Sequence, residues 1–313
     1  MGHSRNILVA GGAGFIGTNL INCLIKQGHQ LYCLDNFLTG SLSNLEHLKH
    51  NPQLEILEHD VIQPIDIKVD MIYNLACAGS PPSYQAAPIH TLKTSVYGVE
   101  NLARLALKND CPMFHASTSE IYGEPLTHPQ KESDWGNVNT LGIRACYDEG
   151  KRAAEALLFD YKRSCHLDVR IARIFNTYGP NMQADDGRVI SNFINQVLRS
   201  EPITIYGDGK QTRSFCYVVD MVKAIQVLMA LDSAPATPVN LGNPDEYTII
   251  EIADTIASLL NCTPQLTFKP MPEDDPTRRC PDISLAKQLL AWSPSTNLID
   301  GLSETIDYFK NKF

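Results

Sequence analysis

The sequence predicts an α/β fold, namely a Rossmann-type doubly wound parallel sheet with a smaller C-terminal α/β domain. The first half alternates short β-rich runs with helical patterns, as in the βαβ units of a parallel sheet. A glycine-rich turn joins the first strand directly to the first helix. Beyond residue 179 this alternation gives way to loops and shorter elements. We therefore expect one large parallel sheet followed by a second, smaller unit.

The first half contains the strands and helices of the sheet. Residues 6–12 (NILVAGG) form a buried apolar strand, and residues 15–28 follow with helical spacing and end at Gly28. Two further helices are expected near residues 95–109 and 147–164. The later strands are predicted in QLYCLD, LEILEHD, MIYNLA, CPMFHAST and DVRIARIFN.

The second half is predicted to begin at residue 180, so that the two domains are residues 1–179 and 180–313. Within it, ITIYGDG indicates a strand, and YTIIEIADTIASLL and GLSETIDYFKNKF indicate helices. The segment near residues 216–232 is expected to return to the first domain. In such an architecture a ligand binds beyond the carboxyl ends of the strands, between the two parts.

The composition is that of an ordinary globular protein and narrows the classes of partner. Of the 313 residues 43% are hydrophobic and 19% are charged, and the formal net charge is −9. This acidity argues against a nucleic-acid or an anionic-membrane partner. No run approaches the roughly 18 apolar residues of a membrane span, so we expect a cytoplasmic protein.

Neither a disulfide framework nor a metal site is expected. The nine cysteines are scattered without a C-x-x-C pair, which favours reduced thiols over disulfides or a zinc site. His47 and His50 have helical spacing but no third ligand near them in the sequence. The acidic pairs at 185–186 and 274–275 are interpreted as loop residues, because a glycine or a proline follows each pair.

The turn GGAGFIG predicts a dinucleotide site. It places Gly11, Gly14 and Gly17 between a strand and a helix, where glycines permit the tight turn, the approach of a pyrophosphate and close helix–strand packing. The start of the helix offers unpaired N–H groups to the phosphates. Asp35 ends the next strand, and a carboxylate there accepts ribose hydroxyls and repels a 2′-phosphate, which favours NAD over NADP.

Two further stretches predict catalysis. YDEGK places Tyr147 and Lys151 four residues apart on one helix face. Lys151 can lower the pKa of the phenol, and Tyr147 can take a proton from a substrate hydroxyl as hydride leaves the same carbon. Alone this spacing is more often a solvated helix face. Together with the glycine turn and the run HASTSEIYG, which sets Thr118 and Ser119 before Glu120, it indicates a dehydrogenase-like site.

With these motifs the chain resembles the extended short-chain dehydrogenases/reductases, and within them the UDP-glucuronate decarboxylases (UDP-xylose synthases). The resemblance covers nearly the whole chain, and CYDEGKR, DDGRV and RRCPDI carry it more specifically than the glycines do. The chain departs from the family pattern at Ala78, Gly79, Ser95 and Ala145. The other stretches that carry the resemblance are ILVAGGAGFIGTNL, DNFLTGSLSNLEHL, SPPSYQAAPIHTLKT, STSEIYG, VRIARIFNTYGP and YGDGKQTRSFCYVVD.

The resemblance implies a homodimer built through a four-helix bundle, a tightly held NAD, and UDP-glucuronate as substrate. The first domain would bind NAD and the second mainly the nucleotide sugar. The implied catalytic residues are Thr118, Ser119, Glu120, Tyr147 and Lys151. The implied NAD contacts are Gly11, Gly14, Phe15, Ile16, Gly17, Asp35, Asn36, Thr39, Asp60, Val61, Lys93, Tyr147 and Lys151. The residues expected to hold the UDP-sugar are Tyr84, Arg144, Asn176, Arg188, Val189, Tyr206, Gln211, Arg213 and Arg279.

Three other functions compete with decarboxylation. A nucleotide-sugar 4,6-dehydratase shares the oxidation at C4 but has Asp-Glu where this chain has Ser119-Glu120. A 4-epimerase shares Tyr147 and Lys151 and needs no carboxylate at position 120. A non-catalytic module that binds NAD or a nucleotide sugar would not need the tyrosine, lysine and threonine that are present. The serine before Glu120 favours the decarboxylase.

Overall fold

The computed structural model describes residues 4–276 and 278–312, and its centre is a parallel sheet of seven strands among these residues. The order is β11-β6-β5-β4-β1-β2-β3, which contains the 3-2-1-4-5-6 order of the Rossmann fold. Every pairing in it is parallel, so the predicted fold class is confirmed. The strands are β1 (Asn6–Ala10), β2 (Gln30–Asp35), β3 (Leu54–Glu58), β4 (Met71–Asn74), β5 (Met113–Thr118), β6 (Val169–Ile174) and β11 (Val239–Leu241).

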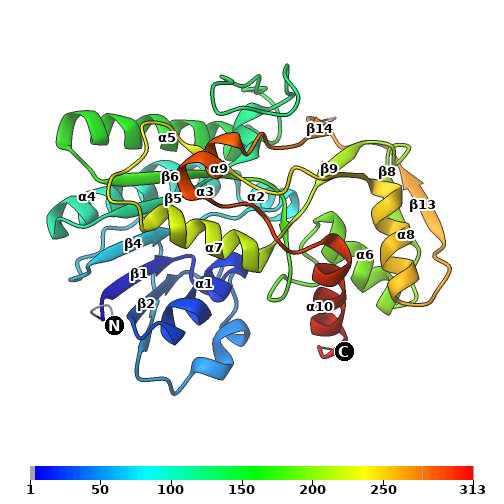
Figure 1. Ribbon diagram of the computed structural model, residues 1–313, viewed down its shortest axis with the longest axis horizontal. Coiled ribbons are helices and arrows are strands. Elements are labelled where there is room, and N and C mark those ends of the chain that lie inside the picture. Colours follow the sequence, from blue (N-terminus) through cyan, green and yellow to red (C-terminus); the bar gives the residue numbers. More distant parts are fainter. Residues whose placement is uncertain (1–3, 277, 313) are drawn as a thin grey trace.

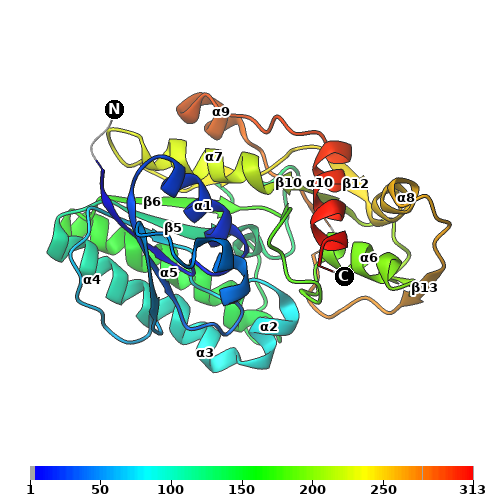
Figure 2. The ribbon, with the colours of Figure 1, turned by 90° about the horizontal axis from the view of Figure 1, so that it is seen from below.

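Helices cover both faces of this sheet (Figure 2), with α7 and α9 on one side and α4 and α5 on the other. The first strand shows why both faces need cover, because Ile7 and Val9 enter one hydrophobic core and Leu8 and Ala10 the other. The helices concerned are α1 (Phe15–Lys26), α4 (Val99–Asn109), α5 (Ala145–Cys165), α7 (Val218–Met229) and α9 (Ser284–Leu290).

Some helix boundaries differ from the prediction. The helix expected near 95–109 begins earlier, since α3 (Pro88–Lys93) and a π-helical turn, η2 (Thr94–Gly98), lead into α4. The helix predicted from Tyr247 begins at Ile249, because Thr248 closes a capping box with Glu251. The last helix, α10 (Leu298–Lys310), begins earlier than predicted because the Asn297 side chain caps it. Residue 313 of that prediction lies outside the described residues.

The second part lies beyond one end of the sheet (Figure 1). Its helices are α6 (Val189–Leu198), α8 (Ile249–Leu259) and α10. One small sheet has the order β12-β9-β14, and two others pair β13 with β8 and β10 with β7. The strands are β7 (Thr177–Tyr178), β8 (Ile203–Tyr206), β9 (Thr212–Ser214), β10 (Cys216–Tyr217), β12 (Glu246–Thr248), β13 (Leu266–Lys269) and β14 (Arg278–Arg279).

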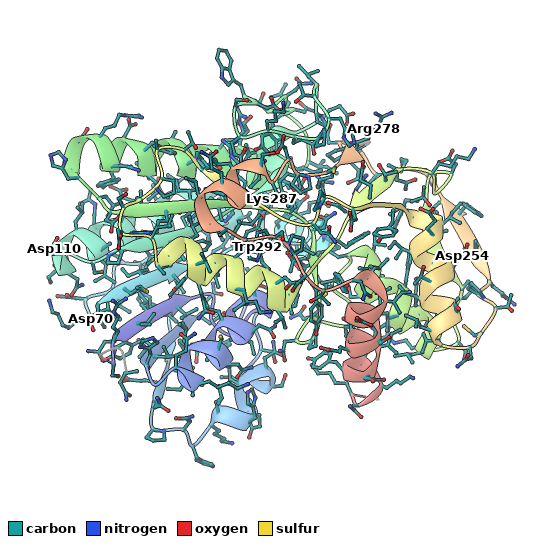
Figure 3. All side chains as sticks on the ribbon, in the orientation of Figure 1. Asp70, Asp110, Asp254, Arg278, Lys287 and Trp292 are labelled. Carbon is teal, nitrogen blue, oxygen red and sulfur yellow. The ribbon has the colours of Figure 1, made fainter. Side chains whose placement is uncertain are left out.

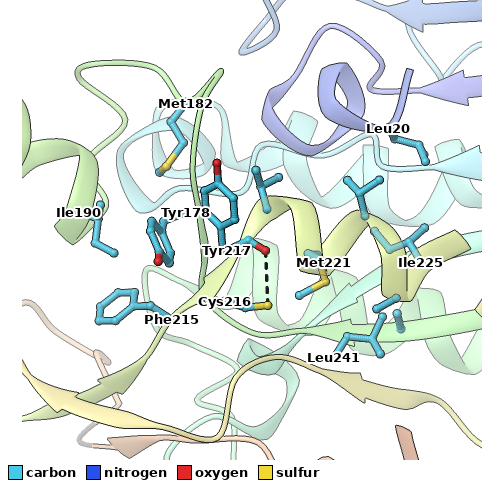
Figure 4. Packing of buried hydrophobic residues seen from close by; sticks show 14 of the residues in the cluster. Leu20, Tyr178, Met182, Ile190, Phe215, Cys216, Tyr217, Met221, Ile225 and Leu241 are labelled. Atoms are coloured by element: carbon cyan, nitrogen blue, oxygen red, sulfur yellow. Dashed lines mark hydrogen bonds between the residues drawn. The ribbon is translucent and has the colours of Figure 1, made fainter. Parts of the chain in front are cut away.

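The chain returns to the large sheet after residue 216. Helix α7 contacts α1. Strand β11, which the sequence did not predict, pairs with β6. Figure 4 shows Met221 and Ile225 of α7 beside Leu20 of α1, and Tyr178, Phe215 and Ile190 continuing the same packing toward the second part. The division at residue 179 stays a prediction.

The carboxyl ends of the strands face the second part. Figure 3 shows Asp70 and Asp110, which precede β4 and β5, at the edge of the molecule opposite to Arg278 and Asp254 of the second part. A ligand site is therefore expected between the two parts. No helix among the described residues has the length and apolarity that crossing a membrane requires.

Candidate active site

A cavity of about 560 Å³ lies between the carboxyl ends of the strands and the second part. All the predicted site residues line it except Asp60 and Lys93. The Asp60 carboxylate accepts a hydrogen bond from Asn36 Nδ2 (3.0 Å) and lies 2.7 Å from His90 Nε2. Lys93 is exposed at the end of α3. The structure thus gathers residues from distant parts of the sequence around one space.

The glycine turn between β1 and α1 is shaped by close backbone contact. Gly11 has φ +75°, and a Cβ on Gly17 would lie 2.1 Å from the Gly11 carbonyl oxygen. Helix α1 begins without a side-chain cap and without an acidic residue in its first turn. Its first N–H groups therefore remain available to an anion, and this turn fits the pyrophosphate of NAD.

Asp35 is anchored at the end of β2. Its two carboxylate oxygens accept hydrogen bonds from the Ala13 N–H (3.0 Å) and the Phe37 N–H (2.9 Å). Burial raises the pKa of Asp35, and the backbone hydrogen bonds partly oppose this rise. Each carboxylate oxygen can accept a second hydrogen bond, so the carboxylate can still receive ribose hydroxyls.

Tyr147 and Lys151 lie on the inner face of α5, 8% and 4% exposed. Lys151 Nζ donates to the Ala116 carbonyl (2.7 Å) and lies 5.8 Å from the centre of the Tyr147 ring. Burial raises the pKa of Tyr147, whereas a hydrogen bond with the Thr118 hydroxyl lowers it. The pKa of Tyr147 is thus raised, whereas we expected Lys151 to lower it. Tyr84 stacks on Tyr147 with ring centres 4.9 Å apart.

The hydroxyl residues Ser117, Thr118 and Ser119 lie at the end of β5, and Ser117 and Thr118 have different partners. Thr118 caps the short helix η3 (Ser119–Tyr122), and its hydroxyl oxygen accepts the Glu120 N–H at 3.2 Å. Ser117 instead donates to the buried carboxylate of Glu155, which also pairs with Arg173. Of these hydroxyls, Thr118 is thus the one beside Tyr147, and Ser117 belongs to the structural core.

Five charged side chains form a cluster at the substrate side of the cavity, which we call the arginine cluster. Arg144 binds Glu120 (2.8 Å) and Asp275 (2.9 Å), Arg213 binds Asp275 (2.8 Å), and Arg279 binds Glu120 (2.8 Å). Each of the three arginine side chains is at most 10% exposed. Three guanidinium groups against two carboxylates leave a positive surplus, which suits an anionic ligand.

Asp275 is the member of this cluster that the sequence missed. It lies in a loop, as expected, but it pairs with two arginines instead of facing solvent. Burial alone would raise its pKa, but Arg213, Arg279 and Arg144 hold the pKa of Asp275 below its usual value. Burial and the neighbouring Arg279 lower the pKa of Arg213. No spacing motif in the sequence marks Asp275, because its partners Arg144 and Arg213 come from the residue before α5 and from β9.

Asp148 is a second residue that the sequence did not single out. It follows Tyr147, is 6% exposed, and its Oδ1 has no hydrogen-bond partner within the described part of the chain. Burial, and secondly the charge of Glu120, raise the pKa of Asp148 to about 7. A partly protonated carboxyl group therefore lies beside the catalytic centre near neutral pH.

The other predicted substrate residues lie in the second part or at its junction. Arg188 precedes α6, pairs with Asp186 and lies 5.5 Å from the Phe15 ring. Gln211 donates to the Tyr206 carbonyl at 2.6 Å. Arg279 also donates to Asn176 at 3.2 Å. Val189 opens α6 and lines the cavity.

Comparisons with known proteins agree with this geometry. Residues 7–242 match the family model described as the NAD dependent epimerase/dehydratase family. UDP-glucuronic acid decarboxylase 1 of Arabidopsis thaliana is 50% identical over 306 residues, which are 98% of this chain and 70% of that protein. UDP-glucuronic acid decarboxylase 1 of Danio rerio is 48% identical over 308 residues, covering 98% of this chain and 73% of that protein.

A solved structure shares both the fold and the type of ligand expected here. UDP-glucuronic acid 4-epimerase from Bacillus cereus, in complex with UDP-glucuronic acid and NAD, superposes with a TM-score of 0.89. It is 26% identical and covers 98% of this chain and 100% of its own. The expected similarity to the decarboxylases is confirmed, and the structural neighbour shows that the fold also serves epimerases.

Proposed function

The chain belongs to the NAD dependent epimerase/dehydratase family, and on this basis we propose that it converts UDP-glucuronate into UDP-xylose and CO2. Relatives about 50% identical over nearly the whole chain are decarboxylases. The observation that carries the proposal is the arginine cluster, in which Glu120 lies between two arginines beside Tyr147 and Thr118. Such a site suits a sugar that bears a carboxylate as well as a diphosphate.

The chemistry needs an electron sink next to the carboxylate. Bound NAD, held at the glycine turn and Asp35, would supply the transfer of hydride from sugar C4 and its later return. A ketone at C4 makes the uronate a β-keto acid, whose carbonyl accepts the electrons left when the C5–C6 bond breaks. The enolate that remains is protonated at C5, and reduction at C4 completes UDP-xylose without net oxidation.

The side chains of the protein move the protons in this series of reaction steps. Tyr147 takes the proton of the C4 hydroxyl as a phenolate. Burial raises the pKa of this phenol, so the positive charge of Lys151, whose Nζ lies 5.8 Å from the ring centre, must favour the phenolate. Thr118, hydrogen-bonded to Tyr147, stabilises the oxygen as it becomes a carbonyl. Lys151 orients the ribose from its position below the Tyr147 ring.

Glu120 acts after the first oxidation. Its carboxylate is held by Arg144 and Arg279, so an incoming carboxylate or phosphate competes for these guanidinium groups. We propose that Glu120 then manages the proton at C5, alone or through water, with Ser119 assisting. Arg144 is placed to meet the carboxylate of the sugar, since it precedes α5 and lies three residues before Tyr147.

The rival functions differ in what they require of this cluster. A 4-epimerase of the same fold needs the tyrosine and lysine but keeps the carboxylate of its substrate. A 4,6-dehydratase needs an acid in the place of Ser119. The decarboxylases are nearly twice as similar in sequence as the epimerase, 50% against 26%, and this difference favours decarboxylation.

Incubation with UDP-glucuronate tests the proposal. The protein should release CO2 and form UDP-xylose in equal amounts, without added NAD once NAD has co-purified. Nuclear magnetic resonance of the nucleotide product separates the alternatives, because UDP-galacturonate identifies an epimerase. Binding of UDP-glucuronate without any turnover would identify a non-catalytic module.

The role of Glu120 is tested by Glu120→Gln. We expect this variant to lose CO2 release by about 100-fold or more, in line with the usual effect of removing an acid–base group, while NAD and UDP bind as before. A matched variant, Glu149→Gln on the outer side of α5, should retain full activity. Loss of UDP affinity in Glu120→Gln would show that Glu120 positions the nucleotide instead.

We further propose a cytoplasmic homodimer. Exposed apolar side chains on the segment that runs from α3 through η2, namely Ile89, Leu92 and Tyr97, support an interface in which this segment and α5 of two copies form a four-helix bundle. Analytical ultracentrifugation should give a dimer, and Tyr97→Asp should shift it toward monomer.

A further inference from the structure

A second group of reactive side chains lies outside the cavity, at the small sheet β12-β9-β14. His128, Glu246 and Cys280 each offer one ligand atom, and these three atoms all lie within 4.8 Å of one another. None of the three residues lines the catalytic cavity. The sequence could not reveal this group, because its members come from a loop after β5, from β12 and from the segment after β14.

The strand register places these side chains on the face opposite to the arginine cluster. Glu246 pairs with Ser214, whereas Arg213, the neighbour of Ser214, pairs with Arg279. Because side chains alternate along a strand, Glu246 points away from Arg213, and Cys280 points away from Arg279. The sheet therefore carries substrate-binding arginines on one face and this group on the other.

Backbone and side-chain hydrogen bonds hold the three residues in place. The Gln130 N–H donates to the Cys280 carbonyl (2.9 Å), and the Cys280 N–H donates to Gln130 Oε1 (2.8 Å). Thr212 donates to one carboxylate oxygen of Glu246 (2.7 Å), and the other oxygen lies 2.8 Å from His128 Nε2. The group is thus built on a paired scaffold, and Glu246 already has the outer partner that metal-ligating carboxylates usually have.

The chemistry of the group matches a thiophilic cation. Imidazole nitrogen, carboxylate oxygen and thiolate sulfur are the ligands of zinc, at distances of about 2.0–2.3 Å. Ligand atoms around such an ion are about 3.5 Å apart, so the sulfur needs to approach the other two atoms by roughly 1 Å. Cys280 is 2% exposed, which shields the sulfur from competing solvent.

We propose that His128, Glu246 and Cys280 bind one divalent cation of the Zn²⁺ class, with a water molecule as the fourth ligand. The ion would join the loop before Gln130 to the segment that follows Arg279. It would thereby fix the strand from which Arg279 reaches into the arginine cluster. Burial, and secondly the charge of Glu246, raise the pKa of the Cys280 thiol to about 12, so ion binding must displace the thiol proton.

Cobalt binding to the metal-free full-length protein tests this site. We expect one equivalent of Co²⁺ to produce a thiolate-to-cobalt charge-transfer band in the near ultraviolet, with release of about one proton. Zn²⁺ should abolish the band by displacement. Cys280→Ser should remove the band, and Cys262→Ser, which changes an exposed cysteine, should leave it intact.

Two further variants keep the test decisive if Cys280→Ser folds poorly. His128→Asn and Glu246→Gln should each weaken Co²⁺ binding by about 10-fold or more, and Zn²⁺ should raise the melting temperature of the native protein but not of His128→Asn. A band that survives Cys280→Ser, or the absence of a band in the native protein, would overturn the proposal. The group would then be a His–Glu ion pair beside a buried thiol only.

Discussion

The two ends of the cavity are built to hold their ligands by different means. At the NAD end, Gly11 and Gly17 bring backbone groups together, and the uncapped start of α1 offers N–H groups. At the substrate end, the arginine cluster relies on charged side chains that come from η3, the residue before α5, β9, β14 and the loop that holds Asp275. One end thus depends on the absence of side chains, and the other depends on their charge.

This difference determines how each end should respond to substitution. The backbone contacts at the glycine turn leave no room for a methyl group, but they do not depend on any single charge. In the arginine cluster each charge is paired with a group of opposite sign, so removal of one group weakens the compensation of another. Steric and electrostatic substitutions should therefore separate binding of NAD from binding of the sugar nucleotide.

The largest effect is expected for Gly17→Ala. A Cβ at this position would lie 2.1 Å from the Gly11 carbonyl oxygen and 2.8 Å from Gly12 Cα, so α1 would have to move away from β1. Overpacking of this kind costs about 1–3 kcal/mol, and since the pyrophosphate site itself is displaced we expect NAD binding to fall by about 100-fold. The NAD content of the purified protein and a fluorescence titration measure the loss.

Gly28→Ala provides the control for this variant. A Cβ there meets no atom within 4 Å, although φ is +86°, and the strain should cost only about 1–2 kcal/mol of stability. Gly28→Ala should keep its NAD. Equal loss of NAD from both variants would mean that general destabilisation, and not the turn, controls the cofactor.

An intermediate effect is expected for Arg144→Gln at the other end. The substitution leaves Glu120 with Arg279 and Asp275 with Arg213, and it removes the group placed to meet the sugar carboxylate. Hydrogen bonds to charged groups contribute about 1.5–3 kcal/mol, so KM for UDP-glucuronate should rise about 10- to 100-fold while NAD binding stays unchanged. Steady-state kinetics and NAD titration measure the two quantities.

Arg163→Gln is the matched control on the same helix, since Arg163 forms an exposed pair with Asp160 and such pairs contribute about 0.2–1 kcal/mol. Arg163→Gln should change neither the KM for UDP-glucuronate nor the affinity for NAD. If Arg144→Gln instead lowers NAD affinity, the two ends are coupled and the contrast between them is wrong.

The same contrast explains what could be predicted from the sequence. The glycine turn, Asp35 and the pair Tyr147–Lys151 are local motifs, so their spacing was sufficient to place them in the cavity. Asp275 has partners only in the folded chain, and its loop position gave no sign of them. Lys93 shows the opposite case. Its position in the sequence matches an NAD-contacting position of the family, but its side chain is exposed and does not line the cavity.

Secondary structure was predictable for a similar reason. The strands β1 to β6 are rich in apolar residues and are bounded by turn residues, and each formed where expected. The three-residue strand β11 has too few residues for a periodic pattern, and only its pairing with β6 identifies it. Helix α8 begins two residues later than predicted because Thr248 and Glu251 form a capping box. The sequence contains this signal, but the prediction followed the apolar periodicity of the segment instead.

The smallest effect concerns Asp148, whose pKa near 7 follows from burial and from the charge of Glu120. In the unfolded chain an aspartate titrates near 3.9, so between about pH 4 and pH 7 the folded protein binds more protons than the unfolded chain. Its free energy of unfolding should therefore decrease as pH rises through this window. Asp148→Asn removes the titration, so the variant should melt a few degrees higher than the native protein at pH 8 and at nearly the same temperature at pH 4. Thermal unfolding across this range measures the difference.

A variant that is less stable than the native protein at pH 8 would show that the Asp148 carboxylate is stabilised by the nearby arginines. In that case the positive surplus of the arginine cluster, and not repulsion from Glu120, would govern the substrate end of the cavity.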